Sequence, residues 1–147
     1  MYPYIFYPVG GSRQTPKLIS DIEKAINGEY SAIQCYEKLA GLAQSDQDRE
    51  QILEIRNDEI KHYGQFVAIY RQLTGKQTSP KISEQCPDIW QEGLLFAFRD
   101  EQETVDFYLD ISDSTHDPYI KEVFRRAAAD EQNHAVWFSF YYFNTKG

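Results

Sequence analysis

Residues 58–62 have the sequence Asp-Glu-Ile-Lys-His, and residues 130–134 have the sequence Asp-Glu-Gln-Asn-His. In a helix, residues three apart lie on one face, so each stretch presents a glutamate and a histidine side by side. The offset of 72 residues also relates three other pairs without a gap: Glu29 and Glu101, Tyr36 and Tyr108, and Phe66 and Phe138. This repeat predicts two related helical hairpins, packed about a pseudo-twofold axis that brings their polar side chains together.

Apolar residues recur at steps of three and four along four segments of the chain, which predicts four amphipathic helices. No segment alternates as a strand does, so the predicted fold class is all-α. Serine or aspartate before a helix, and glycine after it, are common helix caps, and Ser20 with Glu23 forms a capping box. We expect helices from Ser20 to about Gln44, from after Ser45 to Gly75, from Asp88 to about Asp113, and from Asp117-Pro118 to about Phe143.

The rest of the chain divides into an arm and a connector. Residues 1–19 hold three prolines and two glycines among aromatic residues, so we expect a non-helical N-terminal arm ahead of a bundle at residues 20–147. The connector at residues 75–87 can stretch about 43 Å, enough to span a helix of about 38 Å, whereas the other loops are short. The bundle is therefore predicted to consist of two antiparallel hairpins joined by one long crossover.

Polar residues interrupt the apolar face of every predicted helix at about the same depth. They are four glutamates and two histidines: Glu29, Glu59, His62, Glu101, Glu131 and His134. Burying four unpaired carboxylates would cost several kcal/mol each, so protons, arginines or metal ions must neutralise them. No lysine or arginine lies on these faces. Two divalent cations would cancel the formal charge of the four carboxylates, and the oxygen and nitrogen donors suit iron, manganese or zinc.

Charge and composition exclude several other classes of protein. The net charge of −8 argues against nucleic acid and against an anionic membrane surface as partners. The chain has no apolar run of about 18 residues and no signal-peptide pattern, so we expect a cytoplasmic protein. Cys35 and Cys86 lie far apart without a Cys-x-x-Cys motif, and we expect neither a zinc ribbon nor a disulfide.

One glutamate from each of two helices and a Glu-x-x-His motif from each of the other two resemble the ligand set of the ferritin-like di-metal carboxylate superfamily. The resemblance covers residues 20–143 and is strongest to the rubrerythrin-like group, with bacterioferritin second. It implies that Glu59 and Glu131 bridge two metal ions, while Glu29 with His62 and Glu101 with His134 each bind one. It also implies that Asp58 orients His134 and that Asp130 orients His62.

The chain departs from these relatives at three points. Met1 is the only methionine, so the paired-methionine haem site of bacterioferritin is absent. No Cys-x-x-Cys follows the bundle, so the rubredoxin module of full-length rubrerythrin is missing. Rubrerythrins carry a further glutamate three residues before the third-helix ligand, and this chain has Phe98 there, which counts against rubrerythrin-type peroxidase chemistry.

The resemblance implies an oxidoreductase whose two metal ions, iron first and manganese or zinc as alternatives, react with O2 or peroxide. A separate electron donor and a homo-oligomer are expected with it. Tyr36 and Tyr108 could hydrogen-bond to the bridging carboxylates, relay an electron, or simply pack as core aromatics. Two other functions stay open: a ferroxidase or iron-storage protein that forms a hollow shell, and a non-catalytic bundle with a vacant or structural metal site.

Overall fold

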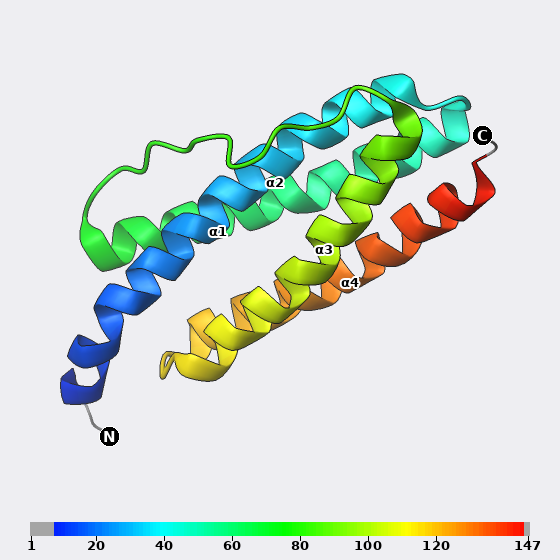
Figure 1. Ribbon diagram of the computed structural model, residues 1–147. Helices are drawn as coiled ribbons and strands as arrows, with labels where there is room; N and C mark the ends of the chain where they lie inside the picture. Colours follow the sequence, from blue (N-terminus) through cyan, green and yellow to red (C-terminus); the bar gives the residue numbers. More distant parts are fainter. Residues whose placement is uncertain (1–7, 146–147) are drawn as a thin grey trace.

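A computed structural model describes residues 8–145 of the chain, and most of them are helical. The four helices are α1 (Pro8–Leu42), α2 (Asp46–Thr74), α3 (Trp90–Ser114) and α4 (Pro118–Asn144), as Figure 1 shows. Residues 8–145 contain no strand, which confirms the predicted all-α class. None of the helices in this range is long and apolar enough to cross a membrane.

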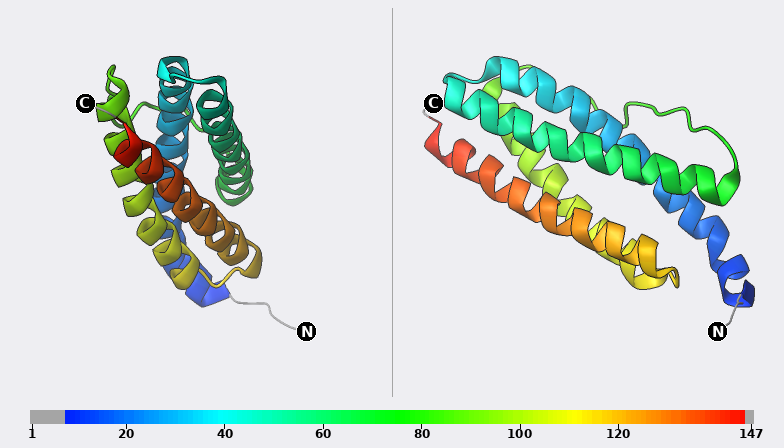
Figure 2. Two further views of the ribbon diagram at one scale, coloured as in Figure 1. Left: turned by 90° about the vertical axis from the view of Figure 1, so that its right-hand side faces the viewer. Right: turned by 180° about the vertical axis from the view of Figure 1, so that it is seen from behind.

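The helices are arranged as two antiparallel hairpins. Helix α1 runs alongside α2, and α3 runs alongside α4, with short loops at residues 43–45 and 115–117 (Figures 1 and 2). The connector between α2 and α3, residues 75–89, passes along the outside of the bundle to return the chain to the other end (Figure 1). The predicted pair of hairpins with one long crossover is therefore confirmed.

Local capping sets the ends of α2 and α4 as predicted. The hydroxyl of Ser45 accepts a hydrogen bond from the Asp48 amide at 3.1 Å, and Gly75 ends α2 with a φ of 72°. Positive φ is a conformation that glycine adopts without the steric cost of a Cβ. The carboxylate of Asp117 accepts hydrogen bonds from the first amides of α4, at 2.8 Å and 3.1 Å.

The predicted start of the first helix is wrong. Helix α1 begins at Pro8 and continues through Pro16, so the segment from residue 8 to residue 19 is helical and the capping box at Ser20 does not begin a helix. A proline inside a helix removes one backbone hydrogen bond and crowds one carbonyl, but the remaining hydrogen bonds of this 35-residue helix persist on both sides of it. The first seven residues of the expected arm lie outside the described part of the chain.

The predicted start of the third helix is also displaced. Helix α3 begins at Trp90, and its N-cap residue Ile89 makes no side-chain capping hydrogen bond. Asp88, the predicted cap, instead pairs with Lys38 of α1, with 2.7 Å between Nζ and Oδ1. The carboxylate therefore contacts the neighbouring helix rather than the amides of its own.

Two apolar clusters fill the bundle, one on each side of a polar layer. On α1, Ile22 and Ile26 belong to the first cluster, Tyr36 and Leu39 belong to the second, and Glu29 lies between them. Where α1 and α3 come together, Gly93 faces Leu39 so closely that an added Cβ would lie 2.7 Å from Leu39 Cδ1. The Leu39 side chain thus occupies the space that a Cβ at position 93 would take.

A disulfide joins Cys35 of α1 to Cys86 of the crossover, with 5.3 Å between their Cα atoms. The expectation that these cysteines form no disulfide is therefore wrong. Hydrogen bonds hold the same part of the crossover against α1: the amide of Ser83 donates to Ser31 Oγ at 2.7 Å, and the amide of Lys81 donates to Asn27 Oδ1 at 2.9 Å. Folding of the crossover along α1 brings together two cysteines that are 51 residues apart.

Candidate metal centre

The six polar residues of the helix faces meet in the middle of the bundle. Each is at most 2% exposed. They form two overlapping groups, within each of which the potential ligand atoms lie no more than 4.8 Å apart. The groups are Glu29, Glu59, His62 and Glu131, and Glu59, Glu101, Glu131 and His134. Glu59 and Glu131 belong to both groups, so the geometry offers two adjacent cation sites with two shared carboxylates.

Both histidines direct Nδ1 toward the carboxylates. His62 Nδ1 lies 3.1 Å from Glu59 Oε1 and 3.4 Å from Glu29 Oε2. His134 Nδ1 lies 3.3 Å from Glu131 Oε2 and 3.5 Å from Glu101 Oε2. The three-residue spacing on α2 and α4 creates this arrangement, because it places each histidine one turn beyond a glutamate on the same face.

The other imidazole nitrogen of each histidine contacts an aspartate of the opposite hairpin. His62 Nε2 lies 2.8 Å from Asp130 Oδ2, and His134 Nε2 lies 2.8 Å from Asp58 Oδ2. These are the two crossed contacts that we expected from the sequence. A carboxylate that accepts a hydrogen bond from Nε2–H favours the tautomer whose Nδ1 lone pair is available to a cation.

The two aspartates differ in their surroundings. The side chain of Asp130 is 15% exposed and accepts a hydrogen bond from Arg126 Nε at 3.2 Å, whereas the side chain of Asp58 is 44% exposed. Sequence reasoning missed Arg126, although its position four residues before Asp130 is the usual spacing for an ion pair along a helix. At the matching position before Asp58 the chain has Glu54, so one half of the repeat lacks this contact.

The two tyrosines contact glutamates of the opposite hairpin. The hydroxyl of Tyr36 donates to Glu101 Oε2 at 2.6 Å, and the hydroxyl of Tyr108 donates to Glu29 Oε2 at 2.5 Å. Of the three roles left open by the sequence, hydrogen bonding to carboxylates of the cluster is observed, but the partners are Glu101 and Glu29 rather than the two shared glutamates. A tyrosine side chain is long enough to reach across the bundle. Each hydroxyl therefore contacts a glutamate of the other hairpin rather than the glutamate on its own helix.

Several buried atoms of the cluster have no hydrogen-bond partner among the described residues. They are Glu29 Oε1, Glu101 Oε1, Glu131 Oε2 and His134 Nδ1. A buried polar atom without a partner costs roughly 1–3 kcal/mol, more if it is charged, so such a concentration requires an explanation. Each of these atoms can donate a lone pair to a cation, and the donor set therefore fits a pair of metal ions.

Without metal, the cluster must hold protons. Burial, followed by the charge of Glu101, raises the pKa values of Glu59 and Glu131 well above their usual range. Burial alone would lower the pKa of His62, but contacts with Asp130 and Glu29 outweigh it and raise that pKa to about 12. In the same way, contact with Glu101 outweighs burial and raises the pKa of His134 to about 10. Protons on these groups offset the negative charge that cations would otherwise cancel.

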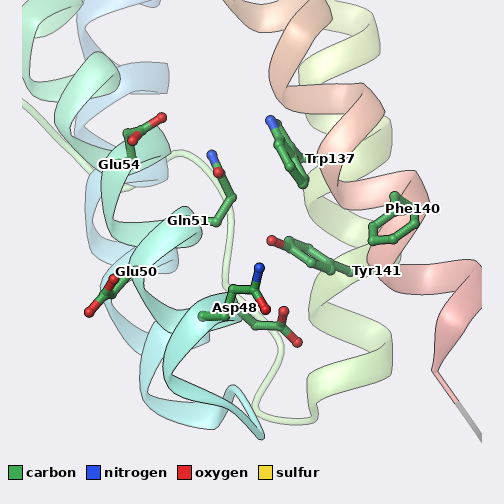
Figure 3. Close-up of a pocket in the computed structure, with 8 residues that line it drawn as sticks. Asp48, Glu50, Gln51, Glu54, Trp137, Phe140 and Tyr141 are labelled. Atoms are coloured by element: carbon green, nitrogen blue, oxygen red, sulfur yellow. The ribbon is translucent and has the colours of Figure 1, made fainter.

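Two surface pockets lie against helices that carry the cluster. One lies between α2 and α4, where Trp137 and Tyr141 point toward Gln51 and Asp48 (Figure 3). None of its lining residues belongs to the cluster. The other, of about 210 Å³, lies between α1, the crossover and α3, and Tyr108 forms part of its wall. Because Tyr108 hydrogen-bonds to Glu29, only one side chain separates this second pocket from the cluster.

Sequence comparison identifies relatives of the chain. A family model described as Rubrerythrin matches residues 92–144, which include Glu101, Glu131 and His134. The uncharacterized protein YhjR of Bacillus subtilis (strain 168) is 57% identical over 140 residues, which cover 95% of this chain and 96% of that protein. The similarity to YhjR therefore spans both hairpins, whereas the family model covers the second.

Solved structures share the fold. A hypothetical protein from Pyrococcus furiosus has a TM-score of 0.75 at 21% identity, covering 86% of this chain and 88% of its own. A ferritin-like, diiron-carboxylate protein from Bacillus anthracis str. Ames has a TM-score of 0.73 at 24% identity, covering 88% and 97%. Rhodobacter capsulatus bacterioferritin has a TM-score of 0.70 at 20% identity, covering 87% and 84%. The chain therefore belongs to the same family as YhjR, its residues 92–144 match the Rubrerythrin family model, and its fold is that of ferritin-like proteins.

Proposed function

We propose that the protein is a di-metal oxidoreductase whose metal pair, iron or manganese, reacts with O2 or a peroxide. The observation that carries this proposal is the pair of overlapping groups that share Glu59 and Glu131. Two adjacent redox-active cations at this site would supply electrons to a small oxidant. Bound there, the pair would act as the redox partner and as the template for a small oxidant.

In this proposal the ligands divide evenly between the two metals. Glu59 and Glu131 would hold both metals, because they belong to both groups. Glu29 and His62 would complete one site, and Glu101 and His134 would complete the other. Oxygen and imidazole nitrogen donors suit iron and manganese, with zinc as a redox-inert competitor.

The surrounding side chains hold these ligands in position. Asp58 and Asp130 accept hydrogen bonds from the Nε2–H groups of the histidines, which keeps both imidazoles in the tautomer that presents Nδ1 to the metal. Tyr36 donates a hydrogen bond to one oxygen of Glu101, and Tyr108 donates one to an oxygen of Glu29. The other oxygen of each carboxylate would be left for a metal. We therefore assign the tyrosines a positioning role.

Metal loading followed by oxidation tests the proposal. Protein purified without a chelator is loaded with Fe(II) under anaerobic conditions, and iron is counted before O2 or hydrogen peroxide is added. We expect two irons per chain, consumption of the oxidant, and an absorption band from the oxidised pair. A Glu131→Leu variant should bind at most one iron and should lose the band. Failure of the wild-type protein to bind iron or manganese would overturn the proposal.

The same preparation discriminates the storage alternative. A ferroxidase that stores iron would take up far more than two irons per chain and would form a hollow shell of many subunits. Light scattering gives the oligomeric mass, and we expect a small homo-oligomer that stops at two irons per chain.

A further inference from the structure

The disulfide between Cys35 and Cys86 is connected to the metal centre through the residue that follows Cys35 in the chain. Cys35 immediately precedes Tyr36 on α1, so their Cα atoms are about 3.8 Å apart. Both residues are buried, with Cys35 at 4% and Tyr36 at 1% exposure, and Tyr36 donates its hydroxyl hydrogen bond to Glu101. One peptide unit and one aromatic ring therefore connect the disulfide to a carboxylate of the metal cluster.

This feature belongs to one hairpin only. The residue that corresponds to Cys35 in the 72-residue repeat is Phe107, so the second half of the site has a phenyl ring where the first half has sulfur. The repeat conserves the glutamates, histidines, aspartates and tyrosines around the metals, but it does not conserve the cysteine. The disulfide is thus an addition to the repeated site and not a part of its common framework.

The crossover is held against α1 without the disulfide. Ser83 and Lys81 donate backbone hydrogen bonds to side chains of α1. Lys38 Nζ lies 3.3 Å from the Cys86 carbonyl oxygen and 2.7 Å from Asp88 Oδ1. A bundle with two apolar clusters and these contacts has less need of a covalent staple than a very small domain has.

A reductant can reach one end of the disulfide. Cys86 lies in the non-helical crossover on the outside of the bundle and is partly exposed, whereas Cys35 is buried beside Tyr36 (Figure 1). A thiol from solution therefore attacks at Cys86, and Cys35 leaves as the thiolate. One cysteine is thus open to a reductant, and the other directly precedes a tyrosine that contacts the cluster, as a path for electrons requires.

We propose that Cys35 and Cys86 are a redox-active pair that supplies electrons to the metal centre during peroxide reduction. This inference rests on the proposed function. The two thiols lose two electrons and two protons and form the disulfide bond, while hydrogen peroxide takes up two electrons and two protons, loses its O–O bond and becomes two waters. An external dithiol then reduces the disulfide and is itself oxidised to a disulfide, which returns the protein to its starting state.

A single-turnover experiment on the full-length protein tests the pair. The protein is reduced, freed of excess reductant, loaded with Fe(II) without oxygen, and mixed with one equivalent of hydrogen peroxide. Free thiols are counted by alkylation and mass spectrometry, and oxidised iron is followed by its absorbance. We expect the loss of two thiols per peroxide at least ~10-fold faster in the iron-loaded protein than in the metal-free protein, and an iron absorbance that rises and then decays as the disulfide forms.

The double variant Cys35→Ser/Cys86→Ser is the matched comparison. It should bind two irons and consume the first peroxide, but its oxidised-iron absorbance should persist, and dithiol-driven turnover should fall at least ~10-fold. If that absorbance decays as in the wild type, or if thiols are lost equally fast without iron, the redox pair is ruled out while the proposed function stands. If the iron-loaded double variant consumes no peroxide, the proposed function fails and the inference fails with it.

Discussion

Nε2 of His62, on the first hairpin, lies 2.8 Å from Oδ2 of Asp130, on the second. The matching contact between His134 and Asp58 has the same length and runs in the opposite direction. Each hairpin therefore supplies the residue that orients the other hairpin's histidine. The orientation of the histidine in each metal site therefore depends on side chains from both halves of the chain.

Replacing Asp130 by Asn should weaken metal binding by about 10- to 100-fold, because the amide does not stabilise the Nε2 proton as a carboxylate does. The effect of Asp58→Asn should be smaller, since Asp58 is 44% exposed and Asp130 is 15% exposed. Competition titration with a chromophoric chelator measures both affinities. Equal and negligible losses in the two variants would show that these aspartates do not orient the ligands.

Replacing Glu59 by Leu should abolish binding of the metal pair yet leave the metal-free protein as stable as the wild type, or more stable by ~1–3 kcal/mol. Burial, followed by the charges of Glu101 and Glu131, raises the pKa of Glu59, and removing its carboxyl removes these costs. Urea unfolding of the chelator-treated proteins measures the free energy. Glu50→Leu, at an exposed position of the same helix, is the control. A fall of several kcal/mol in Glu59→Leu alone would mean that Glu59 is structural.

Binding of two divalent cations should release protons, so metal affinity should rise with pH. In the metal-free protein the pKa values of His62 and His134 are raised to about 12 and about 10, so both imidazoles carry a proton at neutral pH that a metal must displace. Each released proton steepens the dependence by about one decade of affinity per pH unit. Calorimetric titration in two buffers of different ionisation enthalpy counts the protons. Affinity that is flat between pH 6 and pH 8 would contradict this charge balance.

The raised pKa values of the two histidines also predict how the stability of the metal-free protein changes with pH. A group whose folded-state pKa is raised stabilises the fold below its unfolded-state pKa, and this contribution is lost as the pH rises toward the folded value. For His62 and His134 the loss begins above about pH 6.5. Thermal unfolding should therefore show the metal-free protein losing stability from pH 6.5 upward, with a smaller loss after metal loading.

Replacing Gly28 by Leu should slow the reaction with the oxidant. Gly28 lines the pocket that Tyr108 separates from the metal centre, and a Cβ at this position meets no atom within 4 Å, so a leucine can enter the pocket without a clash. The variant should also gain about 0.8 kcal/mol of stability, because glycine is a poor helix former. Stopped-flow absorbance measures the oxidation rate at fixed metal content. Gly64→Leu, an exposed glycine with equally open surroundings, should gain similar stability and keep the wild-type rate.

Much of the fold could be predicted because the deciding signals are local. The caps at Ser45 and Asp117 and the positive φ at Gly75 act within one turn, so sequence places these helix ends. The failures depend on contacts between distant segments. Asp88 pairs with Lys38 rather than capping α3, and no spacing rule connects those positions. The disulfide was missed for the same reason, since only the path of the crossover brings Cys86 to Cys35.

The polar cluster was predictable because the repeat selects its members. Glu101 has acidic neighbours at positions 100 and 103, and only the offset from Glu29 distinguishes it from them. The partners of Tyr36 and Tyr108 were not predictable, because a hydroxyl at the tip of a long side chain can reach either hairpin. Packing across the bundle decides that choice, and it selects the glutamate of the other hairpin in both cases.

The crossed contacts also give the chain the form of a fused homodimer. Neither hairpin contains a whole metal site with its orienting aspartate and tyrosine, yet the polar residues of the two halves match at one offset without an insertion. A single hairpin that paired with its own copy would build the same centre. Because both halves lie in one chain, each can carry a residue that the other lacks. Cys35 against Phe107, and Arg126 against Glu54, are two such differences.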